Sequence, residues 1–296
     1  MSDLPNFKGL DETLPVKTHH AVYSGIDPKV HFTNKSYAGK VVLVTGASRG
    51  LGASAAKHYA RAGASVSIVA RSADLLEQVR AEIVKGTPGA QVLTFTVDVK
   101  DPAAAERAIE ETVKQFGKLD VLVANAGACL PFEKRVGDRE DSLGWWATFE
   151  VNIFGVYNFV RPALKHLEKS EGYVVVVSTM TAQLRIPTAS DYGVSKHAIG
   201  RFVEYVALEH PSVKPFAVHP GAVDTELSRE SGADRKWFTD PPELSSGTFL
   251  ALTSGKYDWL RGRFYDSTWD IDEVAQLKEK ILKNDALVSK LVVKLD

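Results

Sequence analysis

The sequence predicts an α/β protein built on one doubly wound, mostly parallel sheet. Two observations lead to this prediction. From Lys40 onward, short runs rich in β-branched residues alternate with amphipathic segments of helix length. These runs are apolar along their whole length, which is typical of parallel strands that helices cover on both faces. The length of 296 residues suits a single domain, because α/β folds of about 250 residues commonly form one unit.

Six runs predict strands, and a further short strand is expected near the C-terminal end. A sheet of six or seven strands with intervening helices is the doubly wound arrangement, and we expect seven strands. The strand candidates cover residues 41–44, 65–69, 92–97, 121–124, 173–177 and 215–218.

The helix candidates have the expected residues at their ends. Gly63 follows the first and suits a left-handed cap, Gly86 follows the second, and Pro102 stands in the first turn of the third, where its missing N–H costs nothing. The helix candidates span residues 53–62, 73–84, 102–116, 145–160 and 271–283.

The chain divides into three parts on these patterns. Residues 1–38 have no sustained periodicity, and we expect an arm laid over the globular part and frayed at its start. Residues 39–270 form the domain with the sheet, in which a flap is expected at about 226–240. Residues 271–296 form a helical tail.

Composition excludes several classes of protein. The formal net charge is −1, so no strong field favours a nucleic acid or an anionic membrane. The one cysteine, Cys129, excludes an intramolecular disulfide and a Cys-rich zinc site, and we expect no metal. Neither a secretory signal nor an apolar stretch of the roughly 20 residues needed to span a bilayer is visible. We therefore expect a cytoplasmic protein.

A glycine-rich segment lies between the first strand and the first helix. Glycines at this place let the backbone turn tightly and approach a pyrophosphate, whose charge faces the helix N-terminus. An ordinary glycine-rich turn is the alternative, but the position between strand and helix favours a dinucleotide site. The expected contacts are Gly46, Ser48, Arg49, Gly50, Leu51 and Gly52.

The end of the second strand indicates which dinucleotide binds. An acidic residue about 20 positions after the glycines commonly binds the ribose 2′-hydroxyl. Here Arg71 and Ser72 stand at that point without an acid. A guanidinium can bind a 2′-phosphate with paired hydrogen bonds, and Arg49 is a second candidate for this contact. We expect NADP(H) as cofactor.

Four motifs in order resemble the short-chain dehydrogenase/reductase family over roughly residues 38–265. The segment 45–52 resembles its TGxxxGxG motif, 125–127 its NAG motif, 192–196 its YxxxK motif, and Pro220-Gly221 its PG segment. The resemblance implies a Rossmann-type catalytic domain. It also implies further cofactor contacts at Asp98, Val99, Asn125, Ala126, Gly127, Tyr192, Lys196, Pro220, Gly221, Val223 and Thr225.

Tyr192 and Lys196 are the expected catalytic pair. They are four residues apart, so a helix places them on one face. An isolated phenol titrates near pH ~10, and we expect the ammonium and an oxidised nicotinamide to lower the pKa of Tyr192. The resemblance makes the phenol the group that gives or takes the substrate proton. It also makes Asn152 the residue that links the lysine to a proton-carrying water.

The hydroxyl that holds the substrate oxygen is Thr179 or Ser178. The family has a serine thirteen positions before its tyrosine, where this chain has Thr179, so the chain departs from the pattern. Threonine can donate the same hydrogen bond, although its methyl group crowds the site. Successive strand residues point to opposite faces, so we favour Thr179 unless the strand has already ended.

These residues predict an oxidoreductase that transfers hydride between NADP(H) and a carbonyl or secondary alcohol of a small organic molecule. A non-catalytic NADP(H) sensor, or a dehydratase or epimerase on the same scaffold, is the alternative. The resemblance implies a homodimer or homotetramer built on the helices that carry Asn152 and Tyr192. The segment from Arg261 to Asp270 resembles fungal members of the family.

Overall fold

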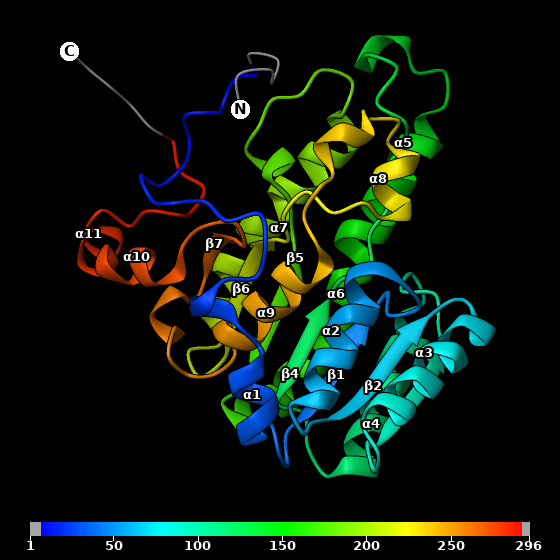
Figure 1. The fold of residues 1–296 in the computed structure, drawn as a ribbon. Coiled ribbons are helices and arrows are strands. Elements are labelled where there is room, and N and C mark those ends of the chain that lie inside the picture. The colour runs from blue at the N-terminus through cyan, green and yellow to red at the C-terminus, as the bar shows by residue number, and fades with distance from the viewer. Residues whose placement is uncertain (1–6, 292–296) are drawn as a thin grey trace.

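The computed structural model describes residues 7–291 of the chain. Its core is one sheet of seven strands, all parallel, in the order β3-β2-β1-β4-β5-β6-β7 (Figure 1). The predicted fold class is confirmed, and the sheet is wholly rather than mostly parallel. The strands are β1 (Val41–Thr45), β2 (Ser65–Ala70), β3 (Val92–Thr96), β4 (Val121–Ala124), β5 (Tyr173–Val177), β6 (Lys214–His219) and β7 (Arg263–Asp266).

Helices cover both faces of the sheet (Figure 1). In one layer α2 (Gly50–Arg61) packs against α3 (Ala73–Gly86) and α9 (Pro242–Leu252). In the other, α4 (Pro102–Phe116) packs against α6 (Gly155–Ser170), with α7 (Ser190–Glu209) beside it over β6. The central strands are therefore buried on both sides, and every residue of β1 is buried.

The order of the strands positions a binding crevice. The chain runs outward from β1 to β3 and then returns to continue on the other side of β1 with β4. The loops that follow β1 and β4 therefore diverge at the carboxyl edge of the sheet, where open α/β sheets bind their ligands.

Four predicted helices differ in their boundaries, and α3 differs only in extending two residues further, to Gly86. Helix α2 begins at Gly50, earlier than expected, directly after the extended residue Arg49. The stretch 145–160 consists of α5 (Ser142–Phe149), a π-helical turn η3 (Glu150–Phe154) and α6. The stretch 271–283 divides at Leu277 into α10 (Ile271–Gln276) and α11 (Lys278–Lys283).

The N-terminal arm lies against the C-terminal half of the domain (Figure 1). Its described part contains a short 3-10 turn η1 (Ser24–Ile26) and α1 (Lys29–Asn34). The phenol of Tyr23 donates to the carbonyl of Trp269 at 2.8 Å and accepts from the backbone N–H of Ile271 at 2.8 Å. Long-range hydrogen bonds thus hold the arm in place. The start of the arm, which we expected to be frayed, lies outside the described residues.

The remaining short elements lie in the connections between strands, and η6 lies at the amino edge of the sheet, just before β7. They are η2 (Val136–Asp138), η4 (Met180–Ala182), α8 (Glu226–Glu230), η5 (Arg235–Trp237) and η6 (Asp258–Leu260). Among residues 7–291, no helix combines the length and the apolar character that a membrane crossing requires.

Candidate active site

The glycine loop connects β1 to α2 with a geometry that only glycine allows. Gly46 has a φ of 65°, in the left-handed region that favours glycine. A methyl group on Gly52 would lie 2.3 Å from the carbonyl oxygen of Gly46 and 2.6 Å from the Asn125 amide nitrogen. A methyl group on Gly50 would meet no atom closer than 3.6 Å, at Thr225. The loop is thus tightly packed at Gly52 and open at Gly50. An open turn before the N-terminus of a helix fits a dinucleotide phosphate.

Thr45 and Asn125 join this loop to the end of β4. The Thr45 hydroxyl oxygen accepts from the backbone N–H groups of Asn125 at 3.0 Å and Ala126 at 3.2 Å. In return, the Asn125 side-chain amide donates to the carbonyls of Thr45 at 2.9 Å and Gly46 at 3.1 Å. The structure therefore brings two predicted cofactor segments together.

The two arginines expected at the 2′-phosphate have different surroundings. Arg49 forms an ion pair with Glu226, the first residue of α8. Arg71, at the end of β2, is exposed and makes no ion pair with any residue of the described range 7–291. Within residues 7–291, the Arg71 guanidinium therefore has no acidic partner, whereas Glu226 of α8 partly balances the charge of Arg49.

The other predicted cofactor contacts in the glycine loop and after β2 and β3 have mostly local partners. Ser48 and Leu51 are half-buried in the glycine loop. The Ser72 hydroxyl oxygen caps α3 and accepts from the Leu75 N–H at 3.4 Å. Asp98 follows β3, and its carboxylate accepts from the Lys100 N–H at 2.9 Å. The Val99 carbonyl accepts from the Asn158 amide at 2.9 Å.

Lys196 points from α7 toward the end of β5. Its ammonium donates to the carbonyl of Val177 at 2.7 Å and lies 5.8 Å from the centre of the Tyr192 ring. Burial lowers the pKa of Lys196 to about 8, an effect that the Cys129 thiol partly opposes. The pKa of this buried ammonium therefore lies nearer to neutral pH than that of an exposed lysine, which suits a group that takes part in proton transfer.

The phenol of Tyr192 differs from the expectation based on the sequence. Burial raises its pKa well above the usual value of 10.0, the nearby Cys129 thiol adds to this, and the Thr179 side chain, as a hydrogen-bond partner, lowers it. The groups of the chain alone therefore do not produce the expected lowering. The physical reason is that desolvation of the phenol exceeds the lowering by the Thr179 side chain, while the Lys196 ammonium lies 5.8 Å from the ring centre.

The structure distinguishes the surroundings of the two candidate hydroxyl groups. Strand β5 ends at Val177, so neither residue lies within the strand. The Ser178 hydroxyl faces the backbone of α7 and donates to the carbonyl of Lys196 at 3.5 Å. Thr179 is extended, and its side chain faces the Tyr192 phenol. Of the two, Thr179 lies on the side where a substrate oxygen would meet the phenol.

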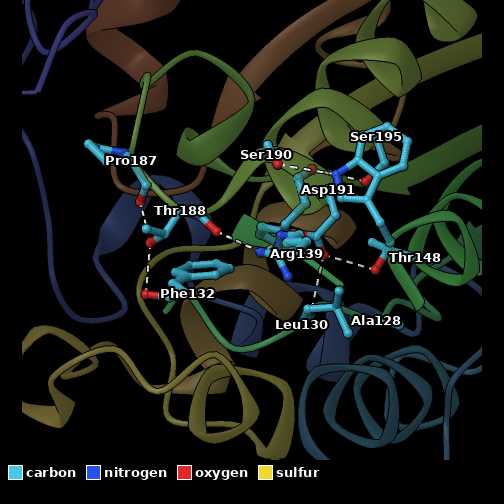
Figure 2. Close-up of polar contacts among 12 residues, drawn as sticks. Ala128, Leu130, Phe132, Arg139, Thr148, Pro187, Thr188, Ser190, Asp191 and Ser195 are labelled. Atoms are coloured by element: carbon cyan, nitrogen blue, oxygen red, sulfur yellow. Dashed lines mark hydrogen bonds and ion pairs between the residues drawn. The ribbon is translucent and has the colours of Figure 1, made fainter. Parts of the chain in front are cut away.

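Asn152 lies in the π-helical turn between α5 and α6 and has no exposed surface. Its side-chain oxygen accepts from the Ala128 N–H at 2.9 Å, and its amide nitrogen donates to the Ala128 carbonyl at 2.9 Å and the Ser195 hydroxyl at 3.0 Å. Asn152 therefore ties the loop after β4 to α7 (Ala128 and Ser195 are labelled in Figure 2). π-Helical turns occur frequently at functional sites.

Gly127 marks where these groups converge. A methyl group on this residue would lie 3.4 Å from the side-chain oxygen of Asn152, from the ammonium of Lys196 and from a methyl group of Leu227. The loop after β4, helix α7 and helix α8 therefore meet at one point of the carboxyl edge.

The segment after β6 closes the site from the other side. Pro220 is buried and Gly221 has a φ of 90°. The Asp240 carboxylate accepts from the N–H of Ala222 at 2.6 Å and pairs with His20 of the arm at 2.7 Å.

Val223 and Thr225 connect the segment after β6 to α8. Val223 is buried and forms a parallel bridge with Asp240. Thr225 caps α8, where its hydroxyl oxygen accepts from the Ser228 N–H at 3.2 Å. The predicted flap 226–240 thus begins with a capped helix next to the glycine loop.

The sequence reasoning missed Thr45, Ser195 and Asp240. Thr45 and Ser195 lie inside the motifs already recognised, so their position could have indicated a bracing role. Asp240 is eighteen residues beyond the segment that it holds, and nothing in the local pattern points to it.

Comparisons with known proteins agree with this geometry. A family model described as short chain dehydrogenase matches residues 40–236. The short chain dehydrogenase mpl6 of Monascus purpureus is 40% identical over 286 residues, which cover 94% of this chain and 96% of that relative.

Solved structures resemble the chain in the same way. A short-chain dehydrogenase/reductase of unknown function from Caenorhabditis elegans, crystallised with cofactor, is 26% identical with a TM-score of 0.70, covering 78% of this chain and 95% of that one. An alcohol dehydrogenase from Thermococcus sibiricus, complexed with 5-hydroxy-NADP, is 28% identical with a TM-score of 0.61, covering 86% of this chain and 95% of that one. The chain therefore belongs to the short-chain dehydrogenase/reductase family, oxidoreductases that act on CH–OH groups with a nicotinamide dinucleotide.

Proposed function

We propose that this protein is an NADP(H)-dependent reductase or dehydrogenase for a carbonyl or secondary alcohol. The observation that carries the proposal is the convergence of Tyr192, Lys196 and Thr179 beside the glycine loop, with Asn152 bracing them. A bound nicotinamide would supply or accept the hydride there.

The side chains of this chain would handle the substrate oxygen and its proton. Thr179 and Tyr192 face one another and would both hydrogen-bond the oxygen, after which Tyr192 would give it a proton or take one. Lys196 would steady the phenolate, because an ammonium favours the charged form of a neighbouring phenol. Asn152 would hold the loop after β4 in place against α7 while the proton moves.

The choice of NADP(H) over NAD(H) rests on the arginines. Arg71 is exposed at the end of β2 without a paired acid among residues 7–291, and a guanidinium binds a phosphate with paired hydrogen bonds. The complex of the Thermococcus relative with an NADP derivative supports the same choice.

The remaining cofactor contacts follow the loops around the crevice. The backbone of Asn125, Ala126 and Gly127 would pass beneath the nicotinamide, and Val223 and Thr225 would hold its carboxamide.

The proposal is tested with Tyr192→Phe. The variant keeps the ring and loses the hydroxyl, so we expect NADPH to bind normally while turnover with a panel of ketones and aldehydes falls about 10²-fold or more. NADPH fluorescence measures binding, and the decay of its absorbance measures turnover. Undiminished turnover would refute the role of Tyr192. Binding without any turnover by the wild-type protein would favour a sensor, and product formed without net change in NADPH would favour a dehydratase or epimerase.

We also propose that the protein forms a homodimer or homotetramer through α6 and α7. Phe154 at the end of η3, Tyr157 in the first turn of α6, and Val194 and Tyr205 on α7 are 44–54% exposed. The Tyr157 ring contacts Phe202 of α7 at 6.3 Å between ring centres, so the two exposed faces adjoin. Adjoining exposed aromatic residues are typical of a subunit contact, and light scattering of the purified protein tests this. The cytoplasmic location expected from the sequence stays a prediction.

A further inference from the structure

Asp191, the residue before Tyr192, is a buried carboxylate with three hydrogen-bond donors. It has no exposed surface. It accepts from the backbone N–H of Leu130 at 3.0 Å, from the Thr148 hydroxyl at 2.9 Å and from the Arg139 guanidinium at 3.3 Å (Figure 2). Because a buried charge is costly without partners, these contacts hold the carboxylate in one orientation.

Arg139 extends the contact to a second segment. Its side chain is 10% exposed, and the nitrogen that contacts Asp191 also donates to the carbonyl of Thr188 at 2.8 Å. Thr188 has a φ of 70°, which is uncommon outside glycine, and its hydroxyl donates to the carbonyl of Phe132 at 2.7 Å. The loop after β4 and the segment before α7 are therefore joined by the Arg139 guanidinium and by the Thr188 hydroxyl (Figure 2).

This network stands where the first turn of α7 has no cap of its own. Ala189 precedes α7 and makes no side-chain cap. The Ser190 hydroxyl instead accepts from the Trp145 indole N–H at 3.1 Å. The orientation of this turn, and with it that of Tyr192, is thus set by contacts from the loop after β4 and from α5.

The same loop also borders the phenol. The Phe132 ring lies 6.1 Å from the Tyr192 ring, centre to centre, and the Cys129 thiol raises the pKa of Tyr192 after the larger effect of burial. A shift of this loop would therefore change both the surroundings of the phenol and the space beside it.

We infer that Asp191 and Arg139 are a positioning pair that fixes Tyr192 and the substrate-side loop 128–139 relative to each other. The inference rests on the proposed function. The pair does not touch the glycine loop, so its loss should alter the handling of the carbonyl substrate and leave the affinity for NADPH unchanged. A displacement of about 1 Å at a reacting group can cost about 10²-fold in rate.

The test compares Asp191→Asn, Arg139→Gln and the double variant D191N/R139Q with wild type. We expect each single variant to lower kcat and raise KM for the carbonyl, so that kcat/KM falls by about 10- to 100-fold at an unchanged Kd for NADPH. The double variant should recover part of this loss, because it leaves no unpaired buried charge. Recovery on removing a second side chain is a result that independent structural roles would not produce.

The matched control is Arg135→Gln in the same loop. Arg135 pairs with Asp138 at 2.6 Å but is 80% exposed, and exposed pairs contribute little. Its kcat/KM should stay within about twofold of wild type. Thr148→Val removes one donor to Asp191 without changing charge, and it provides a milder variant should Asp191→Asn fail to fold.

The outcomes separate the two proposals. A wild-type protein that oxidises no NADPH with any carbonyl overturns the proposed function. The positioning pair alone is overturned if the wild type is active and the folded Asp191→Asn or Thr148→Val variant has unchanged kcat and KM. Equal losses of NADPH affinity and of kcat/KM would also overturn it, because they would indicate a general loss of structure.

Discussion

The dinucleotide side and the substrate side of the crevice are held together in different ways. On the dinucleotide side, the loop from Gly46 to Gly52 takes its form mainly from its own backbone. Its long-range contacts are the hydrogen bonds between Thr45 and Asn125 and the ion pair of Arg49 with Glu226. On the substrate side, Asp191 depends on Leu130, Thr148 and Arg139, which lie 61, 43 and 52 residues away in the sequence.

This difference explains why the glycine loop is recognisable as a short motif and the network around Asp191 is not. A backbone that turns back on itself needs glycine at particular positions, and the spacing of those positions is preserved in the sequence. A buried side-chain network needs only that complementary groups meet in space. The predictions below test whether the two sides respond as differently as their construction suggests.

The largest expected effect is that of Gly52→Ala on the dinucleotide side. The added methyl group would lie 2.3 Å from the Gly46 carbonyl oxygen, and backbone cannot yield as a side-chain end can. We expect the loop to shift, the affinity for NADPH to fall about 10-fold or more, and stability to fall by about 1–3 kcal/mol. NADPH fluorescence titration and urea unfolding measure these changes.

Gly86→Ala is the control for this substitution. Gly86 ends α3, and a methyl group there meets nothing within 4 Å, so both properties should match wild type or stability should rise slightly. An unchanged affinity for NADPH in Gly52→Ala would contradict the view that the backbone shape of the glycine loop builds this side.

The next effect concerns the buried charge of Lys196 on the substrate side. Burial lowers its pKa to about 8, whereas an unfolded chain has a value of about 10.4. Below pH 8 both states hold the proton, and the folded state bears the full cost of burying it. Between pH 8 and about 10.4 the folded chain has lost a proton that the unfolded chain keeps, so the free energy of unfolding contributed by this group rises with pH.

Lys196→Met removes this dependence. The stability of wild type relative to Lys196→Met should rise with pH across that window, by on the order of 3 kcal/mol. Urea unfolding at pH 7 and pH 10 measures the difference. Lys114→Met, at a site 75% exposed, should give no such trend, and a pH-independent difference for Lys196→Met would exclude a lowered pKa.

The smallest effect is expected at the two exposed arginines. Arg71→Gln should raise the Kd for NADPH by about tenfold and leave that for NADH unchanged, because a charged hydrogen bond contributes about 1.5–3 kcal/mol and solvent screens part of it. Arg49→Gln should have a smaller effect, since Glu226 already pairs with Arg49. Equal losses for NADPH and NADH would argue against a 2′-phosphate contact.

Much of the fold could be read from local pattern, and the failures have physical causes. The apolar runs predicted the strands, because parallel strands buried on both faces need such runs. Helix α9 was missed, since its largely buried surface gives no alternation of polar and apolar residues. The π-helical turn around Asn152 was missed because one inserted residue leaves no mark on a helical period.

The sequence by itself determined the sheet, the glycine loop and the spacing of Tyr192 and Lys196, because each depends on residues that are neighbours in the chain or on one helix. Only the tertiary structure decided the direction of the pKa of Tyr192, the pairing of Arg49 with Glu226 and the network around Asp191. Burial and charge pairing depend on which distant segments pack together, and no local pattern contains that information.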